Sequence, residues 1–265
     1  MISSRSNTRI KNIRRLHNRK ARQQSGLFLI EGLRLVMEAM QMGASLESLI
    51  YAPELLISKQ GRALVAEQSR EGIDCLEVSA AVFRSVAVKD NPQGIAAVVQ
   101  QQWQTLDDVR PGEASCWIAL DGAQDPGNLG SILRTGDAVG AAGVILLGDT
   151  TDPYHPTALR ASMGAIFSQC LVRADFTAFV KWAKRHNYTL IGAAGDAPTS
   201  YRDADYRRPL VLLLGSEREG LSPEQRAACD VLVSLPMVGR SDSLNLAVAT
   251  GIILYEIFHQ RHATG

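Results

Sequence analysis

Six short, largely apolar runs between residues 116 and 236 constrain the fold of this chain more than any other feature. The runs are CWIALDG (116–122), GVILLG (143–148), SQCLVRA (168–174), TLIGAAG (189–195), YRRPLVLLLG (206–215) and VLVSLP (231–236). Strands that are apolar along their length are buried on both faces, as in a parallel sheet covered by helices on both sides. This part of the chain is therefore predicted to be an α/β domain with a parallel sheet.

The segments between these runs have the spacing of helices. Helices are predicted over 128–140, 156–165 and 176–186, with a long last helix from about Ser243 to His259. In an open parallel sheet the ligand binds beyond the carboxyl ends of the strands. Three loops follow such ends and are the predicted site: 121–135, 212–222 and 235–251.

Each of these three loops contains glycine and leads into a helix. In the first, the Asp-Pro-Gly sequence at 125–127 predicts a turn, with Asn128 as the helix N-cap. The second ends in Ser-Pro at 222–223, a favourable helix start. In the third, Asp242 or Ser243 is expected to cap the last helix. Loops of this kind present backbone N–H and C=O groups to a ligand at close range.

The first hundred residues have a different pattern. A strand followed by a helix is predicted over 26–43, a strand over 46–53, and a helix over 80–88 between two further strands at 71–79 and 94–100. The segment after them loses its apolar periodicity and gathers Gln, Asp, Pro and Gly. We therefore expect a small α/β domain over 1–100, a linker over 101–114 and the parallel-sheet domain over 115–265.

Charge is distributed unevenly along the chain. The first 30 residues hold eight Lys or Arg and no Asp or Glu, whereas the whole chain has a net charge of +1. The eight are Arg5, Arg9, Lys11, Arg14, Arg15, Arg19, Lys20 and Arg22. Cations gathered in this way favour binding to nucleic acid, since each one placed on a phosphate releases counterions. The alternative is a solvated N-terminal helix.

Several classes of protein are disfavoured by what the sequence lacks. It has no P-loop, no G-x-G-x-x-G and no G-x-S-x-G, so ATPases, Rossmann dehydrogenases and serine hydrolases are disfavoured. The four cysteines are isolated from one another, and His259 and His262 have no further ligands nearby, so no disulfide framework and no metal site are predicted. A reducing, cytoplasmic setting is expected, and no apolar run approaches the roughly 20 residues that span a bilayer.

Three motifs in the parallel-sheet domain carry a family resemblance. They are NLGSILRT (128–135), LLLGSEREGL (212–221) and LPMVGRSDSLNLAVATGIILYE (235–256), in that order. They resemble the three motifs of the SpoU/TrmH family of RNA ribose 2′-O-methyltransferases. GLFLIEGLRLV (26–36) and NPQGIAAVV (91–99) are similar to the RNA-recognition domain that often precedes that catalytic domain. One departure is Asp242, which stands where many members have Glu.

The resemblance implies properties that spacing alone does not predict. It implies a SPOUT catalytic domain whose C-terminal segment forms a deep trefoil knot, with S-adenosylmethionine (AdoMet) bound by the knot loops. It also implies a homodimer whose active site takes residues from both subunits. The missing Rossmann glycine motif agrees with a different way of holding the cofactor.

The resemblance also carries roles to individual residues. Positions that match the cofactor site are Gly215, Leu235 and Leu244, with Leu214, Met237 and Ser243 beside them. Positions that match the catalytic motif residues are Arg134, Asn128, Glu217 and Asn245. Ser216 is a further polar motif position, and both serines are equally suited to bind RNA or to cap a helix.

Methylation of a ribose hydroxyl requires in-line attack on a methyl group bonded to sulfonium, together with removal of a proton. Family precedent favours Arg134 acting on the hydroxyl. Guanidinium has a pKa above about 12, however, so an equal alternative is that Arg134 orients the 2′-OH through a neighbouring phosphate while water takes the proton.

The expected function is thus AdoMet-dependent 2′-O-methylation of structured RNA, with 23S-type ribosomal RNA favoured because the front domain resembles that of rRNA-targeting members. The alternatives are a tRNA ribose methyltransferase of the same family and a catalytically idle RNA-binding module.

Overall fold

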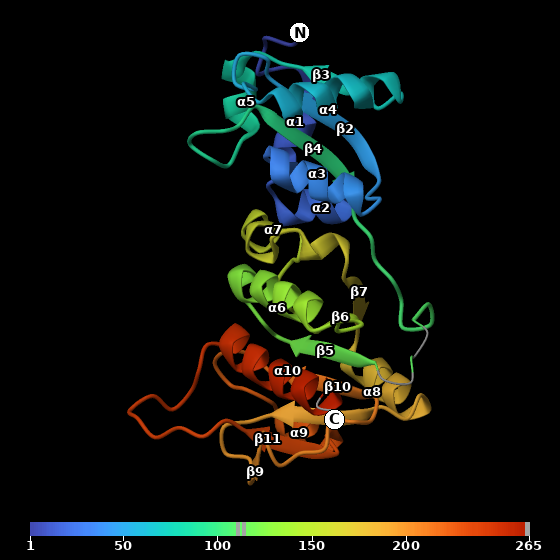
Figure 1. Cartoon of the computed structure of the whole chain (residues 1–265), viewed down its shortest axis with the longest axis vertical. Helices are drawn as coiled ribbons and strands as arrows, with labels where there is room; N and C mark the ends of the chain where they lie inside the picture. The colour runs from blue at the N-terminus through green and yellow to red at the C-terminus, as the bar shows by residue number, and fades with distance from the viewer. Residues whose placement is uncertain (110–111, 113–114, 263–265) are drawn as a thin grey trace. The chain divides into compact units, whose positions relative to one another are not determined.

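The computed structural model describes residues 1–109, 112 and 115–262, in two compact units (Figure 1). Unit 1 comprises Met1–Gln101 with Tyr154–Phe167, and unit 2 comprises Gln102–Pro153 with Ser168–Gly265. Four residues of the predicted linker (110, 111, 113 and 114) and the last three of the predicted second domain (263–265) lie outside the described residues.

Unit 1 is built on a four-stranded mixed sheet with strand order β1-β4-β2-β3. Strands β1 and β2 are antiparallel to β4, and β3 is parallel to β2. The strands are β1 (Leu27–Glu31), β2 (Leu46–Tyr51), β3 (Cys75–Glu77) and β4 (Ile95–Gln100), and the helices are α1 (Thr8–Arg15), α2 (Arg19–Ser25), α3 (Leu33–Gln41), α4 (Lys59–Arg70) and α5 (Ala80–Val86). All the elements predicted for this region are present. Helix α4 had not been predicted, and a helix before residue 26 had been considered only as the alternative to a polyanion-binding arm, whereas the structure has α1 and α2 there.

The basic N-terminal segment is folded against this sheet. Asn7 and Asn18 cap α1 and α2 by accepting backbone N–H bonds, and Gly26 ends α2 in the left-handed conformation. Ile10, Ile13 and Leu16 belong to the hydrophobic core, so this segment is a pair of packed helices and not an extended arm. Its cations are therefore carried on a preformed surface.

A segment from the second half of the chain completes unit 1. It holds α7 (Pro156–Ser162) and the short 3₁₀ helix η1 (Ala165–Phe167). The ring of Phe28 in β1 lies 4.5 Å from that of Tyr154 and 6.4 Å from that of Phe167. Sequence order had placed this segment in the second domain, because ring contacts between residues so far apart leave no local pattern.

Unit 2 is a seven-stranded sheet in which every strand pair is parallel, with order β7-β6-β5-β10-β8-β11-β9. The strands are β5 (Cys116–Asp121), β6 (Gly143–Leu147), β7 (Cys170–Ala174), β8 (Thr189–Ala193), β9 (Thr199–Ser200), β10 (Leu210–Leu214) and β11 (Val231–Ser234). The helices are α6 (Pro126–Ala138), α8 (Phe176–Arg185), α9 (Pro223–Ala228) and α10 (Leu246–His262). The predicted parallel α/β architecture is confirmed.

Helices cover both faces of this sheet, which explains why most of its strands are largely apolar. Trp117 points into a core shared with Phe179 and Trp182 of α8. The next residue, Ile118, points the other way, toward α6, where it leaves room for no side chain at Gly136. Helix α10 packs beside α6 (Figure 1).

Two predicted helix caps are wrong. The N-cap of α6 is Asp125, whose carboxylate accepts the N–H of Gly127 at 2.7 Å, so Asn128 lies within the first turn. The last helix begins at Leu246, and Asn245 accepts the N–H groups of Ala247 and Val248 in place of Asp242 or Ser243. The reason is the same for both helices. An Asx side chain bonds to N–H groups two or three residues ahead of it, and Asp125 and Asn245 are the residues that stand at that distance from the first turn.

Part of the predicted linker is attached to unit 2. The N–H of Gln104 donates to the carbonyl of Leu171, a residue of strand β7, at 2.9 Å. Val109 is buried and belongs to the core beneath the sheet. Loss of apolar periodicity thus marks an irregular segment, and its packing depends on single residues.

Candidate functional site

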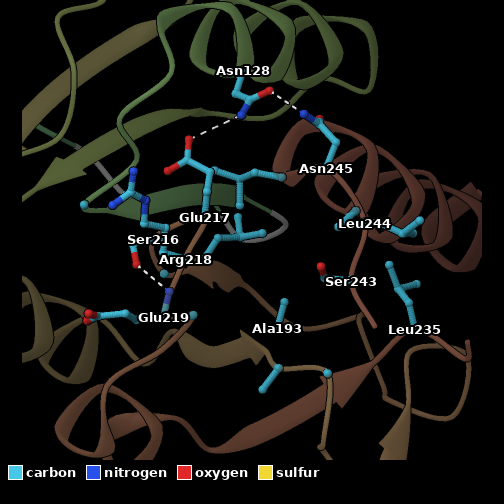
Figure 2. A pocket seen from close by; sticks show the side chains of 18 of the residues that line it. Asn128, Ala193, Ser216, Glu217, Arg218, Glu219, Leu235, Ser243, Leu244 and Asn245 are labelled. Carbon is cyan, nitrogen blue, oxygen red and sulfur yellow. Dashed lines mark hydrogen bonds between the residues drawn. The ribbon is translucent and has the colours of Figure 1, made fainter. Parts of the chain in front are cut away.

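A large cavity opens at one edge of the unit 2 sheet, where the carboxyl ends of the adjacent strands β5, β10, β8 and β11 meet. It has a volume of about 1150 Å³. Its walls are the loops after these strands and the beginning of α10 (Figure 2). The three loops singled out from the sequence therefore come together, as the rule for ligand sites in parallel sheets predicts.

The loop after β10 folds back on itself beside the cavity. The N–H of Gly220 donates to the carbonyl of Ser216 at 3.0 Å, and Gly220 has a φ of +65°, which favours glycine. Any Cβ on Gly215 would collide with the carbonyl of Gly220. The loop can close in this way only because position 215 has no side chain.

Glu217 joins this loop to the one after β5. Its carboxylate accepts the backbone N–H of Gln124 at 3.0 and 3.2 Å and that of Asp125 at 3.2 Å. It also accepts the side-chain amide of Asn128 at 3.3 Å. Glu217 therefore holds the start of α6 against the loop that ends β10 (Figure 2).

The same contacts set the protonation state of Glu217. Partial burial alone would raise the pKa of its carboxyl group. Backbone N–H donors, including those of Gln124 and Asp125, and the side-chain amide of Asn128 all lower the pKa. Together they outweigh the effect of burial, so the pKa of Glu217 is lowered. Glu217 is thus a permanently charged acceptor at neutral pH and is poorly suited to be a general base.

Asn245 adds the third loop to this network. Its side-chain N–H donates to the Oδ1 of Asn128 at 2.8 Å, while its own Oδ1 caps α10. Asn128 thus bridges Asn245 and Glu217, and the three residues form a continuous hydrogen-bonded chain across the cavity wall (Figure 2). Replacing any one of them uncouples loops that are more than 80 residues apart in the sequence.

The opposite wall is largely apolar. Leu214 is buried, Leu244 and Met237 are 40% and 38% exposed, and Leu235 lies beside them. Ser243 also lines the cavity, and its hydroxyl bonds to the carboxylate of Asp242 at 3.2 Å. The predicted cofactor positions thus all line one cavity, although they come from two loops, those after β10 and β11.

Sequence reasoning missed the loop after β8. Ala193, Ala194 and Gly195 line the cavity between the two walls. The signal was present, because TLIGAAG ends at the same edge of the sheet as the other strands. The residues were overlooked because none carries a reactive side chain.

Arg134 is not part of the cavity of its own chain. It lies on α6 one and two-thirds turns beyond Asn128, its side chain is exposed, and it does not line the cavity. It makes no hydrogen bond or ion pair with any of the described residues. The structure thus separates it from the other three predicted catalytic residues.

The cations of the N-terminal helices differ in their surroundings. Arg5, Lys11, Arg15, Arg19 and Lys20 are exposed. Arg9 is paired with Asp74, and Arg14 is half-buried with its guanidinium 3.1 Å from the Ser85 hydroxyl.

Arg22 is the exception and corrects the sequence-based prediction of RNA contact. It is 1% exposed, and its guanidinium donates to the carbonyls of Leu16 and His17 at 2.8 and 3.0 Å. These bonds satisfy the end of α1, so Arg22 holds the two helices together and is not available to a phosphate.

Within the ranges that the structure describes, no group of three or more His, Cys, Asp or Glu side chains has the arrangement of a metal site. None of the helices in the same ranges has the length and apolar character needed to span a bilayer.

Comparison with known proteins agrees with this geometry. Residues 115–255 match the SpoU rRNA Methylase family, and residues 7–97 match the MRM3-like substrate binding domain. A 23S rRNA (uridine(2479)-2′-O)-methyltransferase from Streptomyces viridochromogenes is 34% identical over 93% of this chain and 87% of its own. The 23S rRNA (guanosine(2553)-2′-O)-methyltransferase RlmP of Bacillus subtilis is 31% identical over 97% of this chain and 98% of its own.

Among solved structures, the AdoMet-bound rRNA methyltransferase from Sinorhizobium meliloti superimposes with a TM-score of 0.90 at 37% identity. The superposition covers 100% of this chain and 98% of that one.

Proposed function

The chain belongs to the SpoU rRNA Methylase family, and we infer from this membership and from the cavity that it methylates a ribose 2′-OH of 23S ribosomal RNA with AdoMet as donor. The single observation that carries this function is the cavity in which Glu217, Asn128 and Asn245 join the three motif loops. Ribosomal RNA is favoured over tRNA because the two full-length relatives named above both act on 23S rRNA.

The residues of the cavity fit the proposed cofactor. AdoMet has a flat adenine, a ribose and a charged amino-acid end, so it needs an apolar wall beside polar backbone groups. Leu214, Leu235 and Leu244 supply the wall, and the bare backbone at Gly215 allows close approach. We propose that these residues hold the adenosine, with Met237 and Ser243 at the edge.

When bound, AdoMet would supply a methyl group on a sulfonium, from which a neutral thioether leaves readily. The protein's task is to align the ribose hydroxyl and to assist loss of its proton. The Glu217–Asn128–Asn245 chain fixes the cavity wall before substrate arrives. Arg134 is proposed to act on the hydroxyl, either by removing the proton or by orienting the adjacent phosphate.

The position of Arg134 supports a homodimer. Its own cavity lacks it, and beside α6 the helix α10 exposes Val248 (50%), Ile252 (37%) and Tyr255 (55%). Such an apolar stripe on an otherwise polar surface is typical of a protein interface. We propose that two copies pair through α10, and that the partner subunit's Arg134 completes each site.

Mixing two inactive variants tests this arrangement. In a mixed dimer of Arg134→Ala and Gly215→Ala chains, one site carries both defects and the other carries neither, provided that Arg134 comes from the partner subunit. We expect methyl transfer to be at least about a hundredfold slower than wild type in either variant alone and to recover to between a quarter and a half of wild type after subunit exchange. If each site used its own Arg134, no site would be intact and mixing would restore nothing. A monomer by light scattering at micromolar concentration would also contradict the shared site.

Replacing Glu217 by glutamine tests the network that shapes the cavity. Glutamine keeps one acceptor oxygen but places an NH₂ group against a backbone N–H, and the charge is lost. Hydrogen bonds to charged groups contribute about 1.5–3 kcal/mol, so AdoMet affinity is expected to fall roughly tenfold or more. Calorimetric titration measures this, with Glu224→Gln, an exposed residue of α9, as the matched control. Equal affinity in Glu217→Gln and wild type would exclude Glu217 from organising the site.

Acid dependence gives a second test of Glu217. Because its pKa is lowered in the folded chain, its contribution to the free energy of unfolding is fully present above the ordinary pKa of 4.5. That contribution is lost as the pH falls through the lowered value. Glu217→Gln is expected to lose less stability than wild type between pH 5 and 3 in urea unfolding, because the titrating group has been removed. If wild type and Glu217→Gln lost the same stability between pH 5 and 3, the lowered pKa of Glu217 would be contradicted.

We further propose the domain boundaries 1–100, 101–114 and 115–265 as functional limits, with the first domain binding RNA through its exposed cations. A trefoil knot in the C-terminal segment and a cytoplasmic location are proposed from family resemblance and from the RNA substrate.

The function itself is tested by supplying labelled AdoMet with unmethylated 23S rRNA and with tRNA. Label in the rRNA alone is expected, and label in the tRNA alone would favour the tRNA-modifying alternative.

A further inference from the structure

A second cavity, in unit 1, is not explained by anything above. It is a groove of about 440 Å³ between the N-terminal helices and the sheet. We call it the α1–α2 groove. Its floor takes one residue from each of the four strands, Leu27 of β1, Val98 of β4, Ser48 of β2 and Leu76 of β3. A volume between about 300 and 1,000 Å³ is typical of sites that hold small ligands.

Ser48 is the unusual residue of this floor. It is 5% exposed, yet its hydroxyl makes no hydrogen bond to any residue in the part of the chain that the structure describes. The Ser48 oxygen is not among the fully buried polar atoms that lack a partner, so the hydroxyl is open to the groove, where a ligand or water can reach it. Ser48 therefore presents an unused donor and acceptor to the groove.

An irregularity in strand β2 turns Ser48 toward the α1–α2 groove. The pairing of β2 with β4 changes register between Leu46 and Ser48, so Leu46 opposes Val99 and Ser48 opposes Val98 with Glu47 unpaired between them. This is a β-bulge, a feature that re-aims side chains and is common beside functional sites. Both Glu47 and Ser48 consequently line the groove.

The rim of the groove is polar and carries cations on the α1–α2 side. Arg15 and Asn12 are exposed and make no hydrogen bond or ion pair with the described residues, and Gln24 also lies at the rim. Arg9 is held at the other end by its ion pair with Asp74. The carboxylates of Glu47 and Asp74 also line the groove. The groove thus combines an apolar floor, one hydroxyl open to it and one cation, Arg15, that no described carboxylate pairs.

These features fit one unstacked nucleotide of RNA. A base needs an apolar surface for its face, a hydrogen-bonding group for its edge and a cation for its phosphate. The backbone of an apolar peptide could bond to the Ser48 hydroxyl, but such a peptide carries no anion for Arg15. Resting on the proposed function, we propose that the α1–α2 groove binds a single unstacked nucleotide of the substrate rRNA, with the base on Leu27, Val98 and Leu76, its edge on Ser48 and its phosphate on Arg15.

Two variants and a matched control test the groove. Ser48→Ala removes the hydroxyl and adds no volume, and it should not lower the melting temperature because the lost group has no partner among the described residues. Ala21→Leu fills the groove from α2. Gln23→Leu makes a similar apolar change on the same helix, at an exposed position outside the groove. The probe is a full-length 23S rRNA transcript without methyl groups, with the Kd measured by filter binding at one fixed salt concentration.

We expect Ser48→Ala to weaken RNA binding about three- to tenfold and Ala21→Leu about tenfold, while Gln23→Leu stays within twofold. AdoMet affinity should be unchanged in all three. If Ser48→Ala and Ala21→Leu bind rRNA like wild type, the groove is not a nucleotide site, and a protein partner becomes the alternative. A loss in Gln23→Leu as large as in Ala21→Leu would also overturn the proposal, since the surface of α2 would then be responsible.

The groove and the proposed function can fail separately. If the wild-type chain methylates 23S rRNA and the groove variants bind it normally, only the groove proposal fails. If wild type binds 23S rRNA without methylating it, the proposed reaction fails, and the affinities of the variants still decide the groove. A wild-type chain that does not bind 23S rRNA overturns both.

Discussion

Replacing Arg134 by alanine is expected to lower kcat for methyl transfer by about 10²–10⁴ while AdoMet affinity stays within roughly twofold of wild type. The side chain is exposed, lies outside the cavity of its own chain and makes no hydrogen bond or ion pair with the described residues. Removing it therefore leaves the cofactor cavity and the fold intact. What is lost is the group proposed to meet the ribose hydroxyl or its phosphate.

Single-turnover rates and calorimetric AdoMet titration measure the two quantities separately. Arg185→Ala, an exposed cation at the end of α8, is the matched control and should retain full activity. A lysine at 134 separates the two roles, because lysine keeps the charge for a phosphate but lacks the planar fork of arginine. Full activity in Arg134→Ala would remove Arg134 from both roles, and a fall in AdoMet affinity equal to the fall in rate would assign it to binding.

Gly215→Ala is expected to weaken AdoMet binding at least about a hundredfold, a loss of about 2.7 kcal/mol. Its methyl group would collide with the carbonyl of Gly220, so the loop after β10 must open. Opening that loop displaces Ser216 and Glu217, and with them the contact to the start of α6. Methyl transfer should then be undetectable.

Gly239→Ala is the matched control for this loss. It lies in the loop before α10, where a Cβ would meet nothing within 4 Å. We expect normal AdoMet affinity and activity there. Both variants should melt cooperatively, since the core of the sheet lies away from the loop. AdoMet affinity within threefold of wild type in Gly215→Ala would contradict the account of the cavity.

Much of unit 2 could be predicted because most of its strands are largely apolar. Six of its strands and their order along the chain followed from the runs, and the rule for parallel sheets placed the site at their carboxyl ends. The two-residue strand β9 was missed because two residues carry no pattern. The hydrogen bonds of Glu217 could not be predicted, since they depend on backbone N–H groups that any sequence supplies.

Unit 1 was harder to predict for a different reason. The basic residues of 1–30 favoured a polyanion-binding arm over a solvated N-terminal helix. Ile10, Ile13 and Leu16 show instead that the segment is helical and packed against the core. Arg22 shows the limit of charge patterns, because the same side chain can bind a phosphate or cap a helix end. Membership of residues 154–167 in unit 1 depends on ring contacts that have no local signature.

The most direct test of the central claim is to identify the methylated nucleoside. Wild type and Arg134→Ala are incubated with unmodified total RNA and isotopically labelled AdoMet, the RNA classes are separated, and the nucleosides are analysed by mass spectrometry. We predict label in one 2′-O-methylnucleoside of 23S rRNA with wild type, and none with the variant. Label on a base instead of a ribose, or no label although both RNA and AdoMet bind, would contradict the proposed reaction.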